Sequence, residues 1–207
     1  MIIIIDVENN KNNHICHPAV NEKDGVVVYC ASSQRIDPKY VRAANETGRL
    51  IARAGLKLVC GGGVMGLMAA AIEGCIAEGG QAIGVLPHFM IEKGWGHPQL
   101  TRCIDTPTMH VRKMTMAEMS CAAIALPGGI GTLDELAEIM TWSQLGLFTG
   151  PVIIVNTDGF YDPLVSMFRR MTDEGFMRGD IIPAQIVSSP AEAMDIIKSM
   201  KQTDAYI

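Results

Sequence analysis

The sequence predicts an α/β fold, in which a doubly wound parallel sheet carries helices on both faces within a single domain. Short apolar runs alternate with longer stretches of helical periodicity from Val26 onward. These runs are apolar at nearly every position, as in strands that are buried on both sides, and such strands need helices above and below the sheet. The resulting Rossmann-like architecture binds ligands at the carboxyl ends of its strands.

Residues that begin or end helices separate the apolar runs. Pro38 and Gly55, for example, suit the first position and the end of one helix. The predicted strands cover residues 26–30, 56–60, 81–86, 100–105, 121–126 and 151–156. The predicted helices cover residues 38–55, 66–80, 109–120, 132–147, 162–175 and 191–201. Residues 87–99 are predicted as a looser segment.

The predicted domain covers residues 25–200, with a leader before it and a short tail, 201–207, after it. The leader, 1–24, opens on "MIIIID", which is too short for a signal peptide or a membrane span, and continues as a polar, asparagine-rich run. We expect it to be loose. It contains His14, Cys16 and His17, but no second cluster of ligands has a suitable spacing, so no metal site is expected.

The composition argues against several classes of partner. The formal net charge of -5 disfavours nucleic acid or an anionic membrane as the main partner. The six cysteines contain no C-x-x-C pair and mostly lie in apolar runs, as expected of buried thiols in a reducing compartment. We therefore expect a cytoplasmic protein that binds a small molecule.

Two strand-to-helix junctions, "VCGGGVMGLM" and "ALPGGIGTLDE", are rich in glycine. Glycine lets the backbone approach a ligand closely, and the helix that follows offers unpaired N–H groups to an anion. The first junction satisfies G-x-G-x-x-G, but no acid follows the next strand to hold a ribose, so dinucleotide binding is weakly supported. Because G-K-[ST] is absent, the P-loop class is excluded. A phosphate on a smaller ligand remains.

Glu135 has two interpretations at this point. With Thr132 it fits a capping box, S/T-x-x-E, which has no catalytic meaning. Alternatively it is a functional acid, because "MHVRK" places Arg112 and Lys113 near the start of the preceding helix, where they would converge with the second glycine junction on a phosphorylated ligand.

Taken together, these motifs resemble the Lonely Guy (LOG) family of cytokinin riboside 5'-monophosphate phosphoribohydrolases. "PGGIGTLDE" matches P-G-G-x-G-T-x-x-E, and "MHVRK" matches M-H-x-R-K. "YCASSQRIDPKY", "CGGGVMGLM", "MTWSQLG" and "NTDGFYDPL" resemble further family segments, so that the resemblance spans about Val26 to Pro190. It implies an enzyme, a hydrolase that cleaves the N-glycosidic bond of AMP or an N6-modified AMP to free base and ribose 5-phosphate.

The resemblance also implies site residues and an assembly. Arg112 and Glu135 would be the catalytic pair, with no cofactor and no metal. The candidate substrate-binding residues, from the glycine junctions and the family motifs, are Ser32, Gly62, Gly63, Lys113, Gly128, Gly129, Ile130, Gly131, Thr132 and Thr141. A homodimer or a higher even oligomer is expected, with Trp142, Leu145, Leu147 and Phe148 supplying apolar contact surface. The label "lysine decarboxylase" of many relatives finds no supporting motif here.

Physical chemistry gives the catalytic pair distinct roles. Glycosidic cleavage develops positive charge on the ribose, and a carboxylate in the first turn of a helix should stay ionised and stabilise that charge. Arg112 stays cationic, so it would position the phosphate or the departing base rather than donate a proton.

Three positions depart from the family pattern: Ala31 and Arg35 replace glycines of the first turn, and Gly94 stands where relatives carry a substrate-binding glutamate. Glu92 is a possible substitute for that glutamate, and Arg35 faces either the phosphate or solvent. The alternative function is a Rossmann-like module that binds a nucleotide or molybdenum cofactor without turnover.

Overall fold

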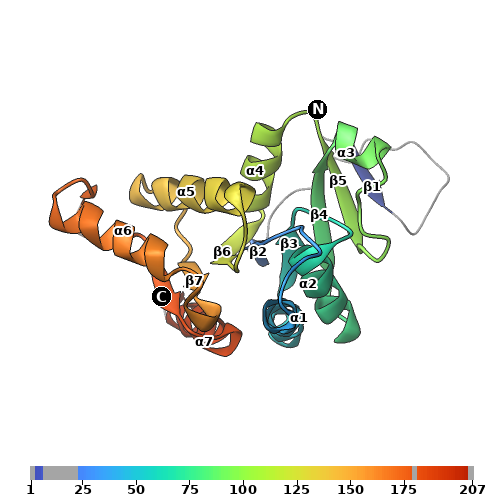
Figure 1. Ribbon diagram of the computed structural model, residues 1–207. Helices are drawn as coiled ribbons and strands as arrows, with labels where there is room; N and C mark the ends of the chain where they lie inside the picture. Colours follow the sequence, from blue (N-terminus) through green and yellow to red (C-terminus); the bar gives the residue numbers. More distant parts are fainter. Residues whose placement is uncertain (1–2, 7–22, 179–180, 205–207) are drawn as a thin grey trace.

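The computed structural model describes residues 3–6, 23–178 and 181–204 and is built around one eight-stranded sheet (Figure 1). The strand order is β1-β5-β4-β3-β2-β6-β7-β8, and β2 to β8 run parallel. The strands are β1 (Ile3–Asp6), β2 (Gly25–Tyr29), β3 (Lys57–Cys60), β4 (Ala82–Pro87), β5 (Arg102–Thr106), β6 (Ser120–Ala125), β7 (Val152–Val155) and β8 (Gln185–Val187). The predicted α/β class with a doubly wound sheet is confirmed.

Six of the helices match the predicted ones. They are α1 (Pro38–Arg53), α2 (Gly66–Ala77), α4 (Met109–Glu118), α5 (Ile130–Gln144), α6 (Asp162–Asp173) and α7 (Pro190–Asp204). The sequence analysis missed the short helix α3 (His88–Glu92), the 3₁₀ turn η1 (Thr157–Gly159) and strand β8. All three are short, and short elements carry too few residues for a periodic pattern.

Helices cover both faces of the sheet, as Figure 1 shows. One apolar core packs α1, α2 and α7 against one face, and the other packs α4, α5 and α6 against the opposite face. Strand β2 serves both cores, because Val26 and Val28 point to the first whereas Val27 and Tyr29 point to the second. The continuous apolar run that predicted a doubly covered strand therefore reflects real burial on both sides. No helix in the described ranges is both long and apolar enough to cross a membrane.

The chain reverses its direction across the sheet between β2 and β6. From β2 it steps outward through β3, β4 and β5, and α4 then returns it to β6 on the other side of β2. Such a switch point leaves a crevice outside the carboxyl ends of the two strands, where α/β proteins bind ligands. The second glycine junction, 126–131, follows β6 directly and therefore lies at this point.

The start of the predicted loose leader is part of the sheet instead. Strand β1 pairs antiparallel with β5, with Ile3 opposite Asp105 and Asp6 opposite Arg102. Isoleucine favours a strand, and this pairing makes β1 the edge strand of the sheet. Residues 7–22, with His14, Cys16 and His17, lie outside the described residues, as do 205–207 of the tail.

The apolar end of α5 is only partly available for subunit contact. Phe148 is 5% exposed and Trp142 packs against the core beneath α5, so these two side chains do not supply the surface that the sequence suggested. Leu145 and Leu147 remain 53% and 69% exposed. The chain turns back after α5 at Gly146, and this turn folds Phe148 under the helix, where Leu147 and Phe148 both bond to the Trp142 carbonyl.

Candidate active site

Helix α5 begins two residues earlier than predicted, which changes the role of Glu135. Gly129 is the N-cap and Ile130 the first helical residue, and no side chain caps the helix. Thr132 is thus the third residue inside the helix, and Glu135 lies in the second turn. The capping-box interpretation is wrong, because neither residue occupies the position that this motif requires.

The N-terminus of α5 is open to a ligand. A Cβ built on Gly129 or Gly131 would meet no atom within 4 Å, and Ile130 between them is 84% exposed. The first N–H groups of a helix have no partner inside it, and they carry the positive end of its dipole. Gly128 has a packing role instead, because a Cβ there would lie 2.1 Å from the buried Thr132 Oγ1. The loop therefore presents bare backbone to an anion.

Arg112 and Glu135 form a buried ion pair beside this loop. Thr108 caps α4 by accepting a hydrogen bond from the Val111 N–H, which fixes the helix start that carries Arg112. The Arg112 Nη1 donates to Glu135 Oε1 at 2.8 Å, and its Nε donates to the Val85 carbonyl at 3.0 Å. Arg112 is 5% exposed and Glu135 7%. The pair thus joins α4, α5 and the end of β4.

Burial dominates the protonation of Glu135. It raises the pKa of the carboxyl group, and the charge and hydrogen bond of Arg112 oppose that rise in part. The sequence analysis expected an ionised carboxylate stabilised by the first turn of the helix, and that reasoning is wrong because Glu135 lies further along α5. A carboxylate held at 2.8 Å from a guanidinium, with a raised pKa, is an ion-paired but stronger base.

Gly61 is a site residue that the sequence analysis missed. It follows β3, and a Cβ built there would lie 2.1 Å from Arg112 Nη2. The guanidinium therefore lies directly against the backbone of this glycine. The sequence signal was the run of three glycines after β3, but only the structure shows which of the three lies against Arg112.

The first glycine junction is closed by contacts within the protein. The Leu67 and Met68 N–H groups at the start of α2 donate to the Ala31 carbonyl at 2.9 and 3.4 Å. The Gly62 N–H donates to Cys60 Sγ at 3.4 Å, and its φ of 68° is one that glycine adopts readily. Of the two predicted anion sites, α5 alone keeps its N-terminus open, and Gly62 and Gly63 lie in the packed turn.

The remaining candidate residues lie around the pair at different distances. Lys113 Nζ contacts Asp134 at 3.0 Å and Glu138 at 3.1 Å; burial lowers its pKa, but these two partners raise it more. Ser32 is exposed in the turn after β2. Thr141 is exposed six residues beyond Glu135 and donates to the Ala137 carbonyl at 2.8 Å, so one protomer does not bring it to Arg112.

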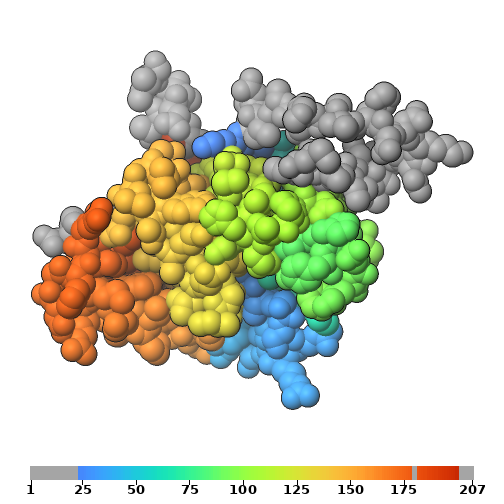
Figure 2. All heavy atoms as spheres, turned by 90° about the horizontal axis from the view of Figure 1, so that it is seen from above, coloured from blue at the N-terminus to red at the C-terminus, as the bar shows by residue number. Residues whose placement is uncertain are grey.

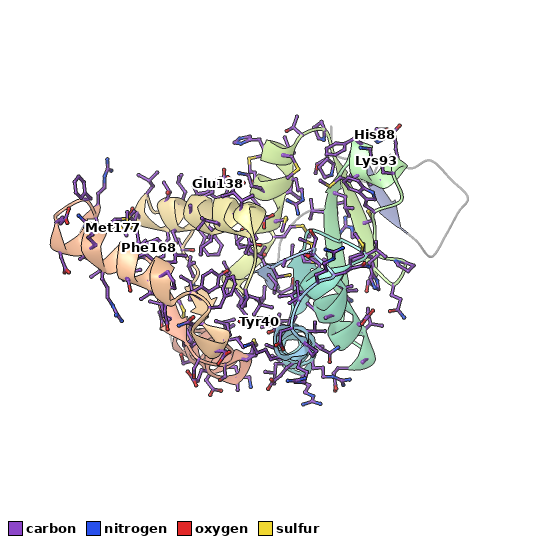
Figure 3. The ribbon with its side chains drawn as sticks, viewed as in Figure 1. Tyr40, His88, Lys93, Glu138, Phe168 and Met177 are labelled. Carbon is purple, nitrogen blue, oxygen red and sulfur yellow. The ribbon has the colours of Figure 1, made fainter. Side chains whose placement is uncertain are left out.

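A cavity of ≈ 300 Å³ lies at the switch point, and Arg35 is one of the residues that line it. Its apolar wall includes Tyr40 and Phe160, whose rings meet edge to face at 5.8 Å, and Figure 3 shows Tyr40 on α1 below the sheet. The full lining is Ala31, Ser33, Arg35, Ile36, Asp37, Tyr40, Pro127, Gly128, Gly129 and Phe160. Arg35 lines this cavity beside the glycine loop and is also exposed to solvent. A larger cavity, of ≈ 490 Å³, lies away from this site between α1 and α2.

Gly94 forms the turn after α3. Its φ is 68°, a conformation that residues other than glycine adopt at a cost in free energy. The backbone conformation therefore favours glycine at position 94, and glycine has no carboxylate to offer a substrate. Glu92, the possible substitute, is exposed and lies 3.4 Å from His88 on the same short helix. Within the described ranges, no group of three or more His, Cys, Asp or Glu residues could hold a metal ion.

The fold and this site define a class: an open α/β protein with an anion-accepting helix N-terminus beside a buried arginine–carboxylate pair at its switch point. The chain belongs to the family described as "Possible lysine decarboxylase", whose model matches residues 68–200. Curated relatives include the probable cytokinin riboside 5'-monophosphate phosphoribohydrolase LOGL1 of Oryza sativa subsp. japonica, which is 36% identical over 86% of this chain and 78% of the relative. The cytokinin riboside 5'-monophosphate phosphoribohydrolase of Rhodococcoides fascians is 40% identical over 73% of this chain and 77% of its own length.

Solved structures of a second kind of protein share the fold. The molybdenum cofactor binding protein from Rippkaea orientalis superposes with a TM-score of 0.67 at 27% identity and covers 87% of this chain and 98% of its own. The Moco Carrier Protein from Chlamydomonas reinhardtii gives 0.64 at 24%, over 90% of this chain and all of that one, which bears on the fold alone. The resemblance to the phosphoribohydrolase family is thus confirmed by the more identical relatives.

Proposed function

We propose that this protein hydrolyses the N-glycosidic bond of a nucleoside 5'-monophosphate, AMP or an N6-modified AMP, to free base and ribose 5-phosphate. The observation that carries the proposal is the buried Arg112–Glu135 pair next to the open N-terminus of α5. Relatives that are 33–40% identical are named as phosphoribohydrolases for cytokinin riboside 5'-monophosphate. The family description names a different reaction, lysine decarboxylation, whereas these relatives are named as phosphoribohydrolases.

The backbone of the glycine loop would bind the 5'-phosphate. Gly129 to Thr132 offer the free N–H groups of α5, and Arg35 lines the cavity next to them. A phosphate held there would place the sugar one step further along α5, toward Glu135. The phosphate would therefore position the glycosidic bond at the catalytic pair.

Glu135 and Arg112 would then act on the sugar and the base. The Glu135 carboxylate orients a water molecule toward the anomeric carbon, takes its proton and stabilises the positive charge that develops on the ribose. The C–N bond breaks with its electron pair leaving on the base, and the water oxygen bonds to the anomeric carbon. The base takes up a proton from solvent, and Glu135 returns the proton it accepted to solvent. Arg112 holds the carboxylate in place and faces the negative charge that develops on the base.

A homodimer is proposed through the exposed face of α5. The exposed apolar side chains are those of Ile130 and Leu133 in the first turn of α5 and of Leu145 and Leu147 in the turn after it, which are 84%, 37%, 53% and 69% exposed. Figure 2 looks onto it, and the atoms of α5, yellow to orange, lie uncovered between those of α4 and α6. Apolar surface of this kind favours contact with a second copy. Thr141 lies on the same side of α5, so it would contact the substrate bound to the other subunit of the dimer.

The compartment and the alternative function follow from the same features. Cys30 and Cys60 are buried free thiols, which supports a reducing, cytoplasmic environment.

A binding module without turnover is less favoured, because the structures that support it are less identical to this chain than the phosphoribohydrolases are.

The decisive experiment measures release of base by chromatography. The purified protein is expected to release adenine from AMP and much less from adenosine, because the bare nucleoside cannot use the N-terminus of α5. Equal rates on the two compounds would contradict the phosphate site, and absence of release from every nucleoside monophosphate tried would contradict the proposed reaction.

A further inference from the structure

A pair of exposed aromatic residues lies on the segment that follows β4. Phe89 is 44% exposed and Trp95 45%. The Lys93 ammonium lies between their rings, 5.8 Å from the centroid of Phe89 and 5.0 Å from that of Trp95. Neighbouring apolar side chains that are exposed together often mark a ligand or partner site. Neither the catalytic pair nor the glycine loop accounts for these rings.

The backbone connects Trp95 to the catalytic pair. Its carbonyl accepts a hydrogen bond from the Val64 N–H at 3.1 Å, and the next residue, Gly96, forms a bridge with Gly63. Gly61 at the start of the same turn lies against the Arg112 guanidinium. The indole is therefore held beside the turn on which Arg112 rests.

The order of these groups matches the order of the parts of a nucleotide. Arg112 meets Glu135 of α5 on one side and Gly61 and Val85, at the ends of β3 and β4, on the other. In the view of Figure 3, Glu138 of α5 and Lys93 at the end of α3 lie on opposite sides of α4. If phosphate lies at α5 and the sugar at the pair, the base continues toward β3 and β4. Trp95 lies in that direction.

We propose that Trp95 is the surface on which the purine base of the substrate stacks; this inference rests on the proposed function. An indole offers a broad π-face on which a purine can stack whatever substituents the purine carries. Such stacking commonly changes affinity by a factor of about 5 to 150. Gly94, with a φ of 68°, turns the backbone just before Trp95, and no carboxylate stands at position 94. Recognition at this position is then by ring contact rather than by hydrogen bonding.

The test compares AMP with ribose 5-phosphate, which keeps the phosphate and sugar but lacks the base. Trp95→Ala is expected to lower kcat/KM for AMP by about tenfold or more, and to leave inhibition by ribose 5-phosphate unchanged. Trp95→Phe, which keeps a ring, is expected to restore most of the loss. Phe176→Ala removes a ring that is 77% exposed beyond α6 and serves as the matched control. An equal loss for both ligands, or a changed oligomeric state in Trp95→Ala, would overturn the proposal.

Fluorescence separates this proposal from the reaction itself. The chain has two tryptophans, and a stacked adenine is expected to quench the emission of Trp95 but not that of Trp142. AMP should therefore quench the wild-type protein, whereas ribose 5-phosphate should not, and the AMP effect should vanish in Trp95→Phe. Quenching without base release would uphold the stacking surface and refute the proposed function. Base release without quenching would refute the stacking surface alone.

Discussion

The guanidinium of Arg112 occupies the space in which a side chain at residue 61 would have to begin. A Cβ on Gly61 would lie 2.1 Å from Arg112 Nη2, well inside any tolerated contact, while Nη1 of the same group bonds to Glu135 at 2.8 Å. The position of the Glu135 carboxylate therefore depends on the absence of a side chain at Gly61, directly after β3. The site therefore requires a residue without a side chain at the end of β3.

Gly61→Ala is expected to displace Arg112 and lower kcat by about 10², since a misplacement of about 1 Å commonly has that effect. Overpacking should also lower the free energy of unfolding by about 1–3 kcal/mol. Urea unfolding of a double-mutant cycle tests the cause. In an Arg112→Ala background the added methyl has nothing to displace, so Gly61→Ala should then cost much less stability. Equal losses in the two backgrounds would show that the contact is not responsible.

Glu135→Gln tests the charge of the carboxylate. The amide oxygen can still accept the hydrogen bond from Arg112, so we expect a folded protein that retains AMP binding. Loss of the negative charge should reduce base release by about 10²–10³. Calorimetry and steady-state kinetics measure the two properties separately. Glu138→Gln makes the same chemical change one turn further along α5 and is the control; similar losses in both variants would assign the effect to helix surface charge.

Arg112→Ala should differ from Glu135→Gln in its binding. It removes a group that faces both the carboxylate and the base, so AMP affinity should fall together with turnover. It also leaves Glu135 buried without its partner, and breaking a buried pair commonly costs about 3–5 kcal/mol of stability. Thermal unfolding and calorimetric titration check both parts. Unchanged affinity for AMP would remove Arg112 from the substrate site.

The pH dependence of kcat should report Glu135. Because burial raises the pKa of this carboxyl group, activity should fall with decreasing pH at a midpoint above the ordinary value of about 4.3. The same shift means that the folded protein binds more protons than the unfolded chain between the two pKa values. The contribution of Glu135 to stability is thus fully present below the unfolded pKa and is lost as pH rises through the folded pKa. A kcat profile that stays flat to about pH 4 would contradict the general-base role.

The exposed apolar side chains at the end of α5 and in the turn after it should control assembly. Introducing charge with Leu145→Lys and Leu147→Lys together should convert a dimer to a monomer, because both side chains are more than half exposed and lie away from the core. Light scattering at micromolar concentration measures the change. Phe176→Lys, at a comparably exposed apolar position, is the control. A wild-type protein that is already monomeric would disprove the dimer.

Much of this fold could be predicted because long elements carry long patterns. The run 26–30 is apolar throughout since both faces of β2 are covered, and Pro38 marks the start of α1 as the sequence indicated. Strand β8 was missed because three residues establish no periodicity, and β1 was missed because its short apolar run was assigned to the leader.

The site was predicted less evenly. Arg112, Glu135 and the loop after β6 come together as the motifs indicated, but the start of α5 was placed two residues late, because Gly129 caps the helix without a side chain to mark it. The first glycine junction looked like an anion site, and only the structure shows the Ala31 carbonyl on the N-terminus of α2. Sequence patterns give the residue types that a ligand needs. Whether another part of the backbone already fills a helix N-terminus is decided by tertiary packing, which the sequence patterns do not show.

The antiparallel strand at the start of the chain has a practical consequence. Strand β1 pairs with β5 from Ile3↔Asp105 to Asp6↔Arg102, and β5 would otherwise be the margin of the parallel sheet. An uncovered margin offers its backbone groups to any extended chain and promotes aggregation. A protein that begins at residue 24 would keep Arg112, Glu135 and the glycine loop and is expected to aggregate more readily. Affinity tags therefore belong at the carboxyl end.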